Sequence, residues 1–173
     1  RQKIKGLSNN IYVETIDGSS EFDLKAFEFD VVIHCAARAH IMNDSSDDQL
    51  SEYRKVNTEG TLNLARQAVE AGVKRFIFIS SIKVNGESTD DCLPFNSKIN
   101  SVPTEFYGLS KYEAEMGLRK IADESGLEVV IVRPPMIYGG AVKGNFNSLL
   151  KLAQSGIPLP FASIDNKRSM VFL

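Results

Sequence analysis

Residues 76–86 read FIFISSIKVNG, and this stretch decides the fold. Four apolar residues come first, Ser80 and Ser81 follow, and the segment closes on Gly86. A short, continuous apolar run is typical of a parallel strand that is buried on both faces. The two hydroxyls that end it have two explanations. Serine is a common strand-ending residue, but open α/β sheets also bind ligands at the carboxyl edge of their strands.

Apolar strand-like segments alternate with helical patterns along the whole chain. Strands are predicted over residues 11–16, 30–35, 75–80 and 128–133, and helices over residues 49–71, 107–125 and 145–155. Residues 45–48 offer a cap for the first helix, and Gly72 ends it. This order predicts an α/β fold, with a parallel sheet, helices on both faces and right-handed crossovers.

Composition and charge exclude several classes of protein. The 173 residues carry a net charge of -2, so no basic field favours nucleic acid. No apolar stretch approaches the roughly 18 residues that a membrane span needs. Cys35 and Cys92 lie in unlike contexts, which argues against a disulfide framework and favours a reducing cytoplasm. Cys35 ends an apolar run and is expected to be a small buried residue.

The regular alternation loosens at Tyr138, Gly139 and Gly140. We therefore predict a first domain over residues 1–138 and the start of a second portion over residues 139–173. Residues 86–103 form the longest irregular polar stretch, and long loops in compact domains are often functional. His34 and His40 have no neighbouring acids or cysteines at metal-ligand spacing, so no metal site is predicted.

Tyr107 and Lys111 are four residues apart and would share one face of a helix. A cation near a phenol favours its ionised form, so such a pair can transfer a proton. The alternative is an ordinary exposed helix pair, because this spacing alone is a weak signal. If the 86–103 loop folds back, Ser81 joins Tyr107 and Lys111 at the carboxyl edge of the sheet. That constellation suits hydride transfer at an alcohol or ketone carbon.

Five motifs occur in the order that is found in the extended short-chain dehydrogenase/reductases: VVIHCAA, VNTEGTLNL, FIFISSIKVNG, YGLSK and RPPMIYG. From Asp30 to Leu173 the chain resembles their nucleotide-sugar epimerase/dehydratase family, near the UDP-glucose 4-epimerases. The resemblance implies a Rossmann-like fold, NAD or NADP as cofactor, and a UDP-sugar as substrate. The residues up to 138 would then be part of the dinucleotide-binding domain, and residues 139–173 the start of the substrate-binding portion.

The resemblance also implies roles for individual residues. The catalytic residues would be Ser81, Tyr107 and Lys111. The cofactor would be contacted by Asp17, Cys35, Ala36, Ala37, Asn57, Ser80, Tyr107, Lys111 and Pro134. The substrate would be contacted by Ser81, Asn145, Phe146, Leu159, Phe161 and Arg168. Taken without the family, Asn145 could cap a helix, Phe161 could be core and Arg168 could be a solvated charge.

The chain departs from the family pattern at both ends. The G-x-G-x-x-G turn that cradles a pyrophosphate is absent from the sequence. We therefore expect a fragment that lacks its first strand-turn-helix and most of the C-terminal substrate domain, and that binds dinucleotide weakly by itself. A missing first strand would expose a sheet edge, which favours association, so a homodimer is compatible with the sequence.

A second departure narrows the reaction. Related 4,6-dehydratases carry Thr-Asp-Glu where this chain has Ser81, Ile82 and Lys83, and Ile82 cannot transfer a proton. Dehydration is therefore disfavoured, and 4-epimerisation or 4-keto reduction of a UDP-sugar remains. Asn85 and the stretch PLPFASIDNKRS resemble bacterial reductases of UDP-4-keto-6-deoxy-N-acetyl sugars. The alternative from another class is a non-catalytic binding or assembly module with a dinucleotide fold.

Overall fold

The computed structural model describes residues 29–39, 48–89, 93–139, 151–156 and 167–172. The chain divides into two compact units, residues 1–133 and residues 134–173. The sequence predicts the boundary five residues later, after residue 138. Each unit is described by itself below.

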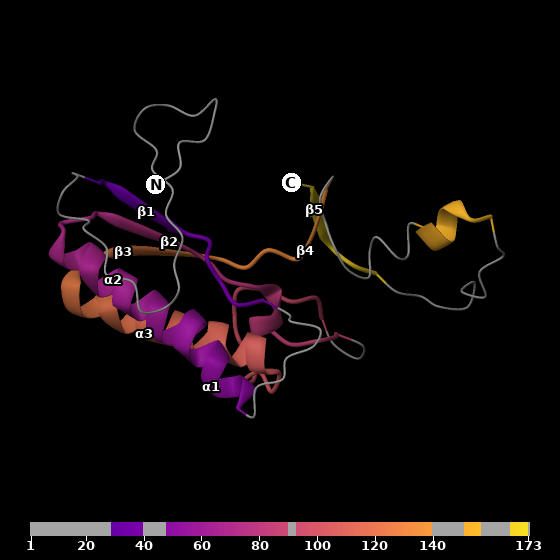
Figure 1. Cartoon of the computed structure of the whole chain (residues 1–173), viewed down its shortest axis with the longest axis horizontal. Helices are drawn as coiled ribbons and strands as arrows, with labels where there is room; N and C mark the ends of the chain where they lie inside the picture. The colour runs from indigo at the N-terminus through magenta and orange to yellow at the C-terminus, as the bar shows by residue number, and fades with distance from the viewer. Residues whose placement is uncertain (1–28, 40–47, 90–92, 140–150, 157–166, 173) are drawn as a thin grey trace. The chain divides into compact units, whose positions relative to one another are not determined.

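A three-stranded parallel sheet is the centre of the first unit (Figure 1). Its strands are β1 (Val31–His34), β2 (Arg75–Ile79) and β3 (Glu128–Val132), in the order β1-β2-β3. Both pairs are parallel, and the register aligns Phe76 of β2 with Val129 of β3. The parallel sheet predicted from the apolar runs is confirmed for these three strands. The strand predicted over residues 11–16 lies outside the described residues.

One long helical segment precedes β2. It consists of α1 (Gln49–Tyr53), the π-helical turn η2 (Arg54–Glu59) and α2 (Gly60–Glu70). The predicted helix over residues 49–71 is confirmed, but the widened π-helical turn in its middle was not predicted. Asp48 caps its start, because the Asp48 carboxylate accepts a hydrogen bond from the Ser51 amide at 3.0 Å.

The second long helix, α3 (Phe106–Ser125), links β2 to β3 and confirms the helix predicted over residues 107–125. Glu105 caps its start, and Gly126 ends it in the left-handed conformation, with φ of +75°. Between β2 and α3 the chain forms the short 3-10 turn η3 (Ile82–Val84) and then an irregular stretch.

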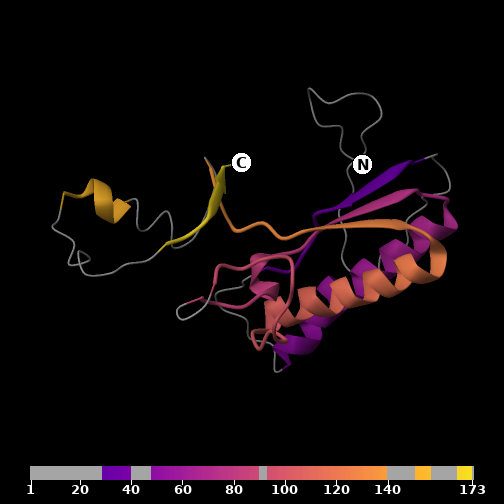
Figure 2. The ribbon, with the colours of Figure 1, turned by 180° about the vertical axis from the view of Figure 1, so that it is seen from behind.

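The core lies between the sheet and helices α2 and α3, which run side by side across one face of it (Figures 1 and 2). Side chains that alternate along the strands point into this layer, which is the period-2 pattern of a pleated strand. The buried cluster consists of Leu64, Ala65, Ala68, Val73, Phe76, Phe78, Ala114, Leu118 and Leu127.

The opposite face of the sheet differs from the prediction. Within the described residues, helices cover only one face, and Ile33 and Val132 on the other face are 62% and 41% exposed. The order β1-β2-β3 explains this, because both crossovers advance in the same direction. Two right-handed crossovers in the same direction place their helices on the same face. Covering the other face requires a reversal of strand order, which the described strands do not make.

The second unit contains a parallel pair of short strands, β4 (Met136–Tyr138) and β5 (Met170–Phe172). The rings of Tyr138 and Phe172 contact edge to face, with centroids 5.4 Å apart. The C-terminal part of the helix predicted over residues 145–155 is present, and residues 145–150 lie outside the described part. Where the structure describes the chain, it contains no helix long and apolar enough to cross a membrane.

Two glycines in α3 test how closely the helix approaches its neighbours. A Cβ on Gly108 would lie 2.8 Å from the backbone oxygen of Lys83, whereas a Cβ on Gly117 would meet only the side chain of Leu62. Leu62 can rotate away, but the Lys83 carbonyl cannot. We expect Gly108→Ala to lower the free energy of unfolding by roughly 1–3 kcal/mol, as overpacking does.

The same substitution at Gly117 should change the free energy of unfolding by less than about 1 kcal/mol, since alanine also improves helix propensity by about that amount. Urea denaturation of both variants measures the difference. Equal losses at the two glycines would contradict a close contact between α3 and η3.

Candidate active site

Ser81 lies at the carboxyl end of β2, where the sheet opens. The ladder continues through the Ser80 amide, which donates to the Val132 carbonyl at 2.7 Å, and then stops. Ser81 is extended and caps η3, because its hydroxyl oxygen accepts from the Lys83 amide at 3.2 Å. Both explanations for a strand-ending serine therefore meet here: Ser81 is a local cap, and its hydroxyl stands at the carboxyl edge of the sheet.

Helix α3 begins opposite this strand end. The Glu105 carboxylate accepts from the amides of Tyr107 and Gly108 at 3.0 and 2.9 Å. An acidic cap of this kind satisfies free amides and complements the positive end of the helix dipole. The missing side chain of Gly108 lets the first turn of α3 approach the Lys83 carbonyl in η3. The helix start and the Ser81 turn are thus in direct contact.

Tyr107 is half-buried, and its phenol lies close enough to the Ser81 hydroxyl for that group to act on its pKa. Burial raises the pKa of Tyr107 above its usual value, the Ser81 hydroxyl lowers it, and Glu105 and Tyr53 raise it further. The Tyr53 ring contacts the Tyr107 ring edge to face, with centroids 6.3 Å apart. Tyr107 is therefore a neutral phenol at physiological pH, held by a hydroxyl on one side and an aromatic edge on another.

Lys111 follows one turn later on the same side of α3 and is only 1% exposed. Its ammonium donates to the Ile79 carbonyl at 3.0 Å and lies 4.4 Å from the centroid of the Phe78 ring. Burial lowers the pKa of Lys111 to about 8, against smaller opposing effects of Cys35 and Glu115. The structure thus places this cation beneath the end of β2.

The expectation that Lys111 lowers the pKa of Tyr107 is wrong for this geometry. The pKa of Tyr107 is raised, and the groups that act on it are burial, Ser81, Glu105 and Tyr53. The reason is the direction of the lysine side chain. Helical spacing brings the two residues to one side, but the Lys111 chain extends inward to the Ile79 carbonyl rather than along the helix.

Asn57 lies in the π-helical turn η2 and is completely buried. Its amide oxygen accepts from the Arg38 backbone amide at 2.8 Å, and its amide nitrogen donates to the Arg38 carbonyl and to Ser110 Oγ, both at 3.0 Å. Ser110 in turn donates to the Tyr107 carbonyl at 2.9 Å. Asn57 therefore ties the segment after β1 to the first turn of α3, and its position in a π-helical turn is typical of functional regions.

His34 ends β1 inside the same polar layer. The Thr61 hydroxyl donates to the Asn57 carbonyl at 2.7 Å, so it accepts from His34 Nε2 at 2.9 Å. Nδ1 is then unprotonated, and it has no hydrogen-bond partner among the described residues. Burial, and then the charge of Lys111, lower the pKa of His34 to about 4. Among the described residues, His34 is therefore hydrogen-bonded at one ring nitrogen only.

The other predicted cofactor contacts divide into two groups. Cys35, Ala36 and Ala37 follow β1 at the same carboxyl edge as Ser81, since β1 and β2 are parallel. Cys35 and Ala37 are exposed, so the expectation of a buried Cys35 is wrong; the side chain falls on the face that no described helix covers. Ser80 is buried instead, and its hydroxyl donates to the Glu115 carboxylate at 2.6 Å.

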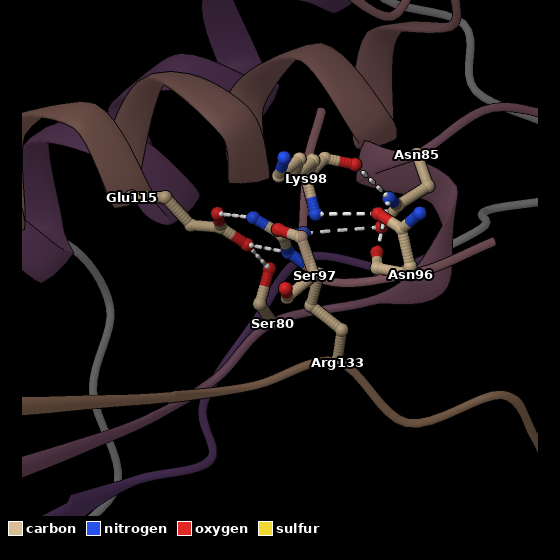
Figure 3. Close-up of polar contacts among 7 residues, drawn as sticks. All are labelled: Ser80, Asn85, Asn96, Ser97, Lys98, Glu115 and Arg133. Atoms are coloured by element: carbon tan, nitrogen blue, oxygen red, sulfur yellow. Dashed lines mark hydrogen bonds and ion pairs between the residues drawn. The ribbon is translucent and has the colours of Figure 1, made fainter. Parts of the chain in front are cut away.

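Glu115 and Arg133 belong to the site although the sequence reasoning assigned them no role. Glu115 is completely buried one turn beyond Lys111, and it pairs with Arg133, which directly follows β3 (Figure 3). The available signal was spacing: Tyr107, Lys111 and Glu115 recur at every fourth residue. A buried charge at such a spacing needs a partner of opposite sign.

The remaining predicted site residues lie outside the described part of the first unit. Asp17, Asn145, Phe146, Leu159 and Phe161 lie outside the described residues. Pro134 and Arg168 belong to the second unit. Among the described residues there is no group of three or more His, Cys, Asp or Glu side chains that could hold a metal ion.

Comparisons with known proteins agree with this geometry. The model of the "NAD dependent epimerase/dehydratase family" matches residues 4–168. The chain is 56% identical over 160 residues to a UDP-glucose 4-epimerase of Vibrio cholerae, an alignment that covers 92% of this chain and 49% of that protein.

Solved structures show the same likeness. A dTDP-glucose 4,6-dehydratase from Streptomyces venezuelae, a double mutant with NAD and DAU bound, superimposes with a TM-score of 0.67 at 27% identity, over 86% of this chain and 47% of that one. A UDP-N-acetylglucosamine 4-epimerase from Bacillus cereus gives a TM-score of 0.65 at 25% identity, over 83% and 47%. The chain thus spans about half the length of these proteins.

Stability should depend on pH through His34. Its pKa is about 4 in the folded chain, against an ordinary value of 6.5 when unfolded, so between these values only the unfolded chain takes up the proton. Stability is therefore full above pH 6.5 and declines as the pH falls toward 4. We expect a loss of roughly 2 kcal/mol from this group between pH 7 and pH 5.

Urea denaturation of the wild type and of His34→Gln at the two pH values measures this contribution. Glutamine keeps a hydrogen-bond donor for Thr61 but does not titrate in this range. The variant should lose less stability than the wild type, and equal losses would show that His34 is not the group responsible.

Lys111→Met should stabilise the fold. At pH 7 the wild-type ammonium is charged and buried, and methionine removes that desolvation cost while it fills a similar volume. We expect the free energy of unfolding to rise by roughly 1–3 kcal/mol at pH 7. The gain should shrink above pH 8, where the folded wild-type chain releases the proton.

Lys120→Met is the matched control for this prediction. Lys120 lies on the same helix, but its side chain is 76% exposed, so its replacement should change stability by less than about 0.5 kcal/mol. A Lys111→Met variant that unfolds more easily than the wild type would mean that the bond to Ile79 outweighs the cost of burying the charge.

Proposed function

The chain belongs to the NAD-dependent epimerase/dehydratase family, and we propose that the protein is an NAD(P)-dependent 4-epimerase of a UDP-sugar. The observation that carries the proposal is the approach of the Tyr107 phenol to the Ser81 hydroxyl at the carboxyl edge of the sheet, with the buried Lys111 one turn further along α3. Two hydroxyls in contact can share one substrate oxygen. A nearby cation supports the charge that develops when a proton moves.

The residues at the end of β1 fit a dinucleotide. Cys35, Ala36 and Ala37 have small side chains and stand at the open edge next to β2, where α/β sheets bind nucleotides. We propose that they lie along the cofactor and that Lys111 holds a ribose hydroxyl. When bound, NAD would take up the hydride from the sugar carbon and return it.

The proton follows a separate path through the chain's own residues. We propose that Tyr107 exchanges the proton of the sugar hydroxyl and that Ser81 donates to the same oxygen. As a neutral phenol, Tyr107 is ready to protonate a keto oxygen when the hydride returns. In the opposite direction the phenolate must form, and the Ser81 hydroxyl, which lowers the pKa of Tyr107, supports that step.

The remaining contacts are assigned by the family resemblance. We propose that Arg168 pairs with the diphosphate, a task suited to a planar bidentate donor. Asn145, Phe146, Leu159 and Phe161 would contact the rest of the nucleotide sugar, Asp17 the adenine side and Pro134 the nicotinamide end. A cytoplasmic homodimer is part of the same proposal.

The second candidate is a 4-keto reductase, and Asn85 favours it. Asn85 stands where epimerases often have tyrosine, and its side chain is engaged by the backbone of residues 96 and 98 rather than exposed at the edge. The two reactions differ in the fate of the hydride. An epimerase uses catalytic NAD, whereas a reductase consumes one NADH for each product molecule.

Tyr107→Phe in the full-length gene product tests the assignment. We expect kcat with UDP-glucose and NAD to fall by roughly two to four orders of magnitude, the usual contribution of acid-base catalysis. Affinity for NAD should hardly change, since the ring remains. Interconversion of UDP-glucose and UDP-galactose, followed by chromatography, is the measurement.

Tyr112→Phe on the same helix is the matched control and should keep full activity. A Tyr107→Phe variant with near-normal turnover would remove Tyr107 from the chemistry. A wild type that converts only UDP-4-keto sugars, with stoichiometric loss of NADH, would favour the reductase. A wild type that binds NAD without any turnover would favour a binding module.

A further inference from the structure

The ion pair between Glu115 and Arg133 joins the ends of two strands to helix α3. The Glu115 carboxylate accepts from Arg133 Nε at 2.8 Å and from Arg133 Nη2 at 2.5 Å, which is the two-pronged geometry of a guanidinium fork. The two side chains are 0% and 10% exposed. The pair is therefore shielded from water. Removing one partner would leave an unpaired buried charge and destabilise the fold.

The same pair holds the residue before Ser81. The Ser80 hydroxyl donates to the Glu115 oxygen that also accepts from Arg133 Nε, at 2.6 Å. The Ser80 amide is meanwhile fixed to the Val132 carbonyl at 2.7 Å. Ser80 is thus bound through both its backbone and its side chain, which sets the point where β2 ends.

The pair also holds the turn that follows Ser81. Arg133 Nη1 donates to Asn85 Oδ1 at 3.2 Å and to the Ser97 carbonyl at 3.0 Å. Asn85 closes η3, and its amide nitrogen donates to the carbonyls of Asn96 and Lys98, both at 2.9 Å (Figure 3). Arg133 therefore connects the end of η3 to the loop around residue 97.

We propose that Glu115 and Arg133 are positioning residues that hold the Ser81 hydroxyl against Tyr107 by fixing Ser80 on one side of it and Asn85 on the other. The inference rests on the proposed function, in which Ser81 and Tyr107 share a substrate oxygen. Neither member of the pair touches that oxygen. They act through the chain on both sides of Ser81.

Helix α3 carries both Tyr107 and the residue that anchors the Ser81 segment. Tyr107 and Glu115 are two turns apart on α3, so the reacting phenol and the anchor for Ser81 belong to one rigid element. Any tilt of α3 moves both together. The contact between Ser81 and Tyr107 is then preserved, whereas a serine held only by its own strand would be left behind. An error of about 1 Å in such a contact can cost a hundredfold in rate.

Glu115→Gln in the full-length gene product tests the inference. One arm of the fork then meets an amide donor, so the pair loosens without a change in side-chain volume. We expect kcat to fall by about ten- to a hundredfold, while KM for the UDP-sugar and Kd for NAD stay within about threefold. A role in general stability alone would not split kcat from KM in this way.

Glu113→Gln is the matched control. Glu113 lies two residues earlier on α3 and forms the same two-pronged pair with Arg54, at 2.9 Å from Nε and 2.5 Å from Nη2. That pair is more exposed and has no bond to Ser80 or Asn85. The control should keep its kcat. Equal losses in the two variants, or no loss in Glu115→Gln, would overturn the inference.

Hydrogen exchange on the 173-residue chain gives a readout that needs no activity. The amides of Lys83, Val84 and Asn85 bond within η3, and that of Lys98 bonds to Asn96 Oδ1. Glu115→Gln should accelerate exchange at these amides about tenfold or more and leave those of β1 unchanged, because local openings are independent of global unfolding. Unchanged exchange in η3 would overturn the inference, whether or not the wild type is active. If exchange in η3 accelerates but the wild type proves inactive, only the proposed function fails.

Asn85→Ala is a second test, for the case in which Glu115→Gln destabilises the whole fold. It leaves the ion pair and the bond from Arg133 to the Ser97 carbonyl intact. It removes the bonds of the Asn85 side chain to Arg133 and to the carbonyls of residues 96 and 98. If exchange accelerates throughout the chain in Glu115→Gln, the kcat of Asn85→Ala decides: a fall of about tenfold with unchanged KM supports the positioning role, and normal kcat overturns it.

Discussion

The first unit depends on a stripe of polar side chains that α3 buries against the carboxyl end of the sheet. Tyr107, Lys111 and Glu115 recur at every fourth residue, and the last two are almost completely enclosed. Buried charges are tolerated only where other groups replace the lost water. Those groups are supplied by the strand ends: the Ile79 carbonyl, the Ser80 hydroxyl and the Arg133 guanidinium. The polar requirements of one helix thereby fix where β2 and β3 end relative to it.

The apolar end of the same layer provides the rigidity. Toward its C-terminus α3 buries Ala114 and Leu118, and Phe76 and Leu127 face them in one cluster. Apolar contacts are not directional, so this cluster holds the helix against the sheet without fixing its exact register. The hydrogen bonds at the other end define the register between them. One helix therefore spans a core that holds it in place and a site that depends on where it is held.

Much of this fold could be predicted from the sequence, because the signals are periodic. The three apolar runs predicted parallel strands at the right residues, and Gly72 marked the end of the first long helix. Coverage of the outer sheet face could not be predicted in the same way. An apolar residue such as Ile33 shows that a face avoids water in the whole protein, and it does not show which segment covers that face. The direction of the two crossovers, which decides the matter here, is a property of the topology.

The convergence of Ser81, Tyr107 and Lys111 could be predicted from the sequence, and the electrostatics around them less so. Ser81, Tyr107 and Lys111 meet at one edge because parallel strands share a carboxyl end and a helix has a fixed pitch. Spacing says nothing about which way a long side chain extends, and Lys111 is not among the groups that shift the pKa of Tyr107. The pairing of Glu115 with Arg133 joins residues 18 apart through tertiary structure. Asn57 in the π-helical turn likewise bonds to Arg38 and Ser110, and local sequence does not predict these tertiary contacts.

The polar layer also explains why the site is costly to maintain. His34 and Lys111 both lie against Phe78, each with a pKa lowered by burial, and each is therefore held in a setting that disfavours its charged form. An apolar layer of the same volume would give a more stable chain. The proposed function accounts for a lysine there, because it places a proton transfer at this edge of the sheet, and sites of this kind often trade stability for activity. His34 is neutral beside it, because burial, and then the charge of Lys111, disfavour a second positive charge in that layer.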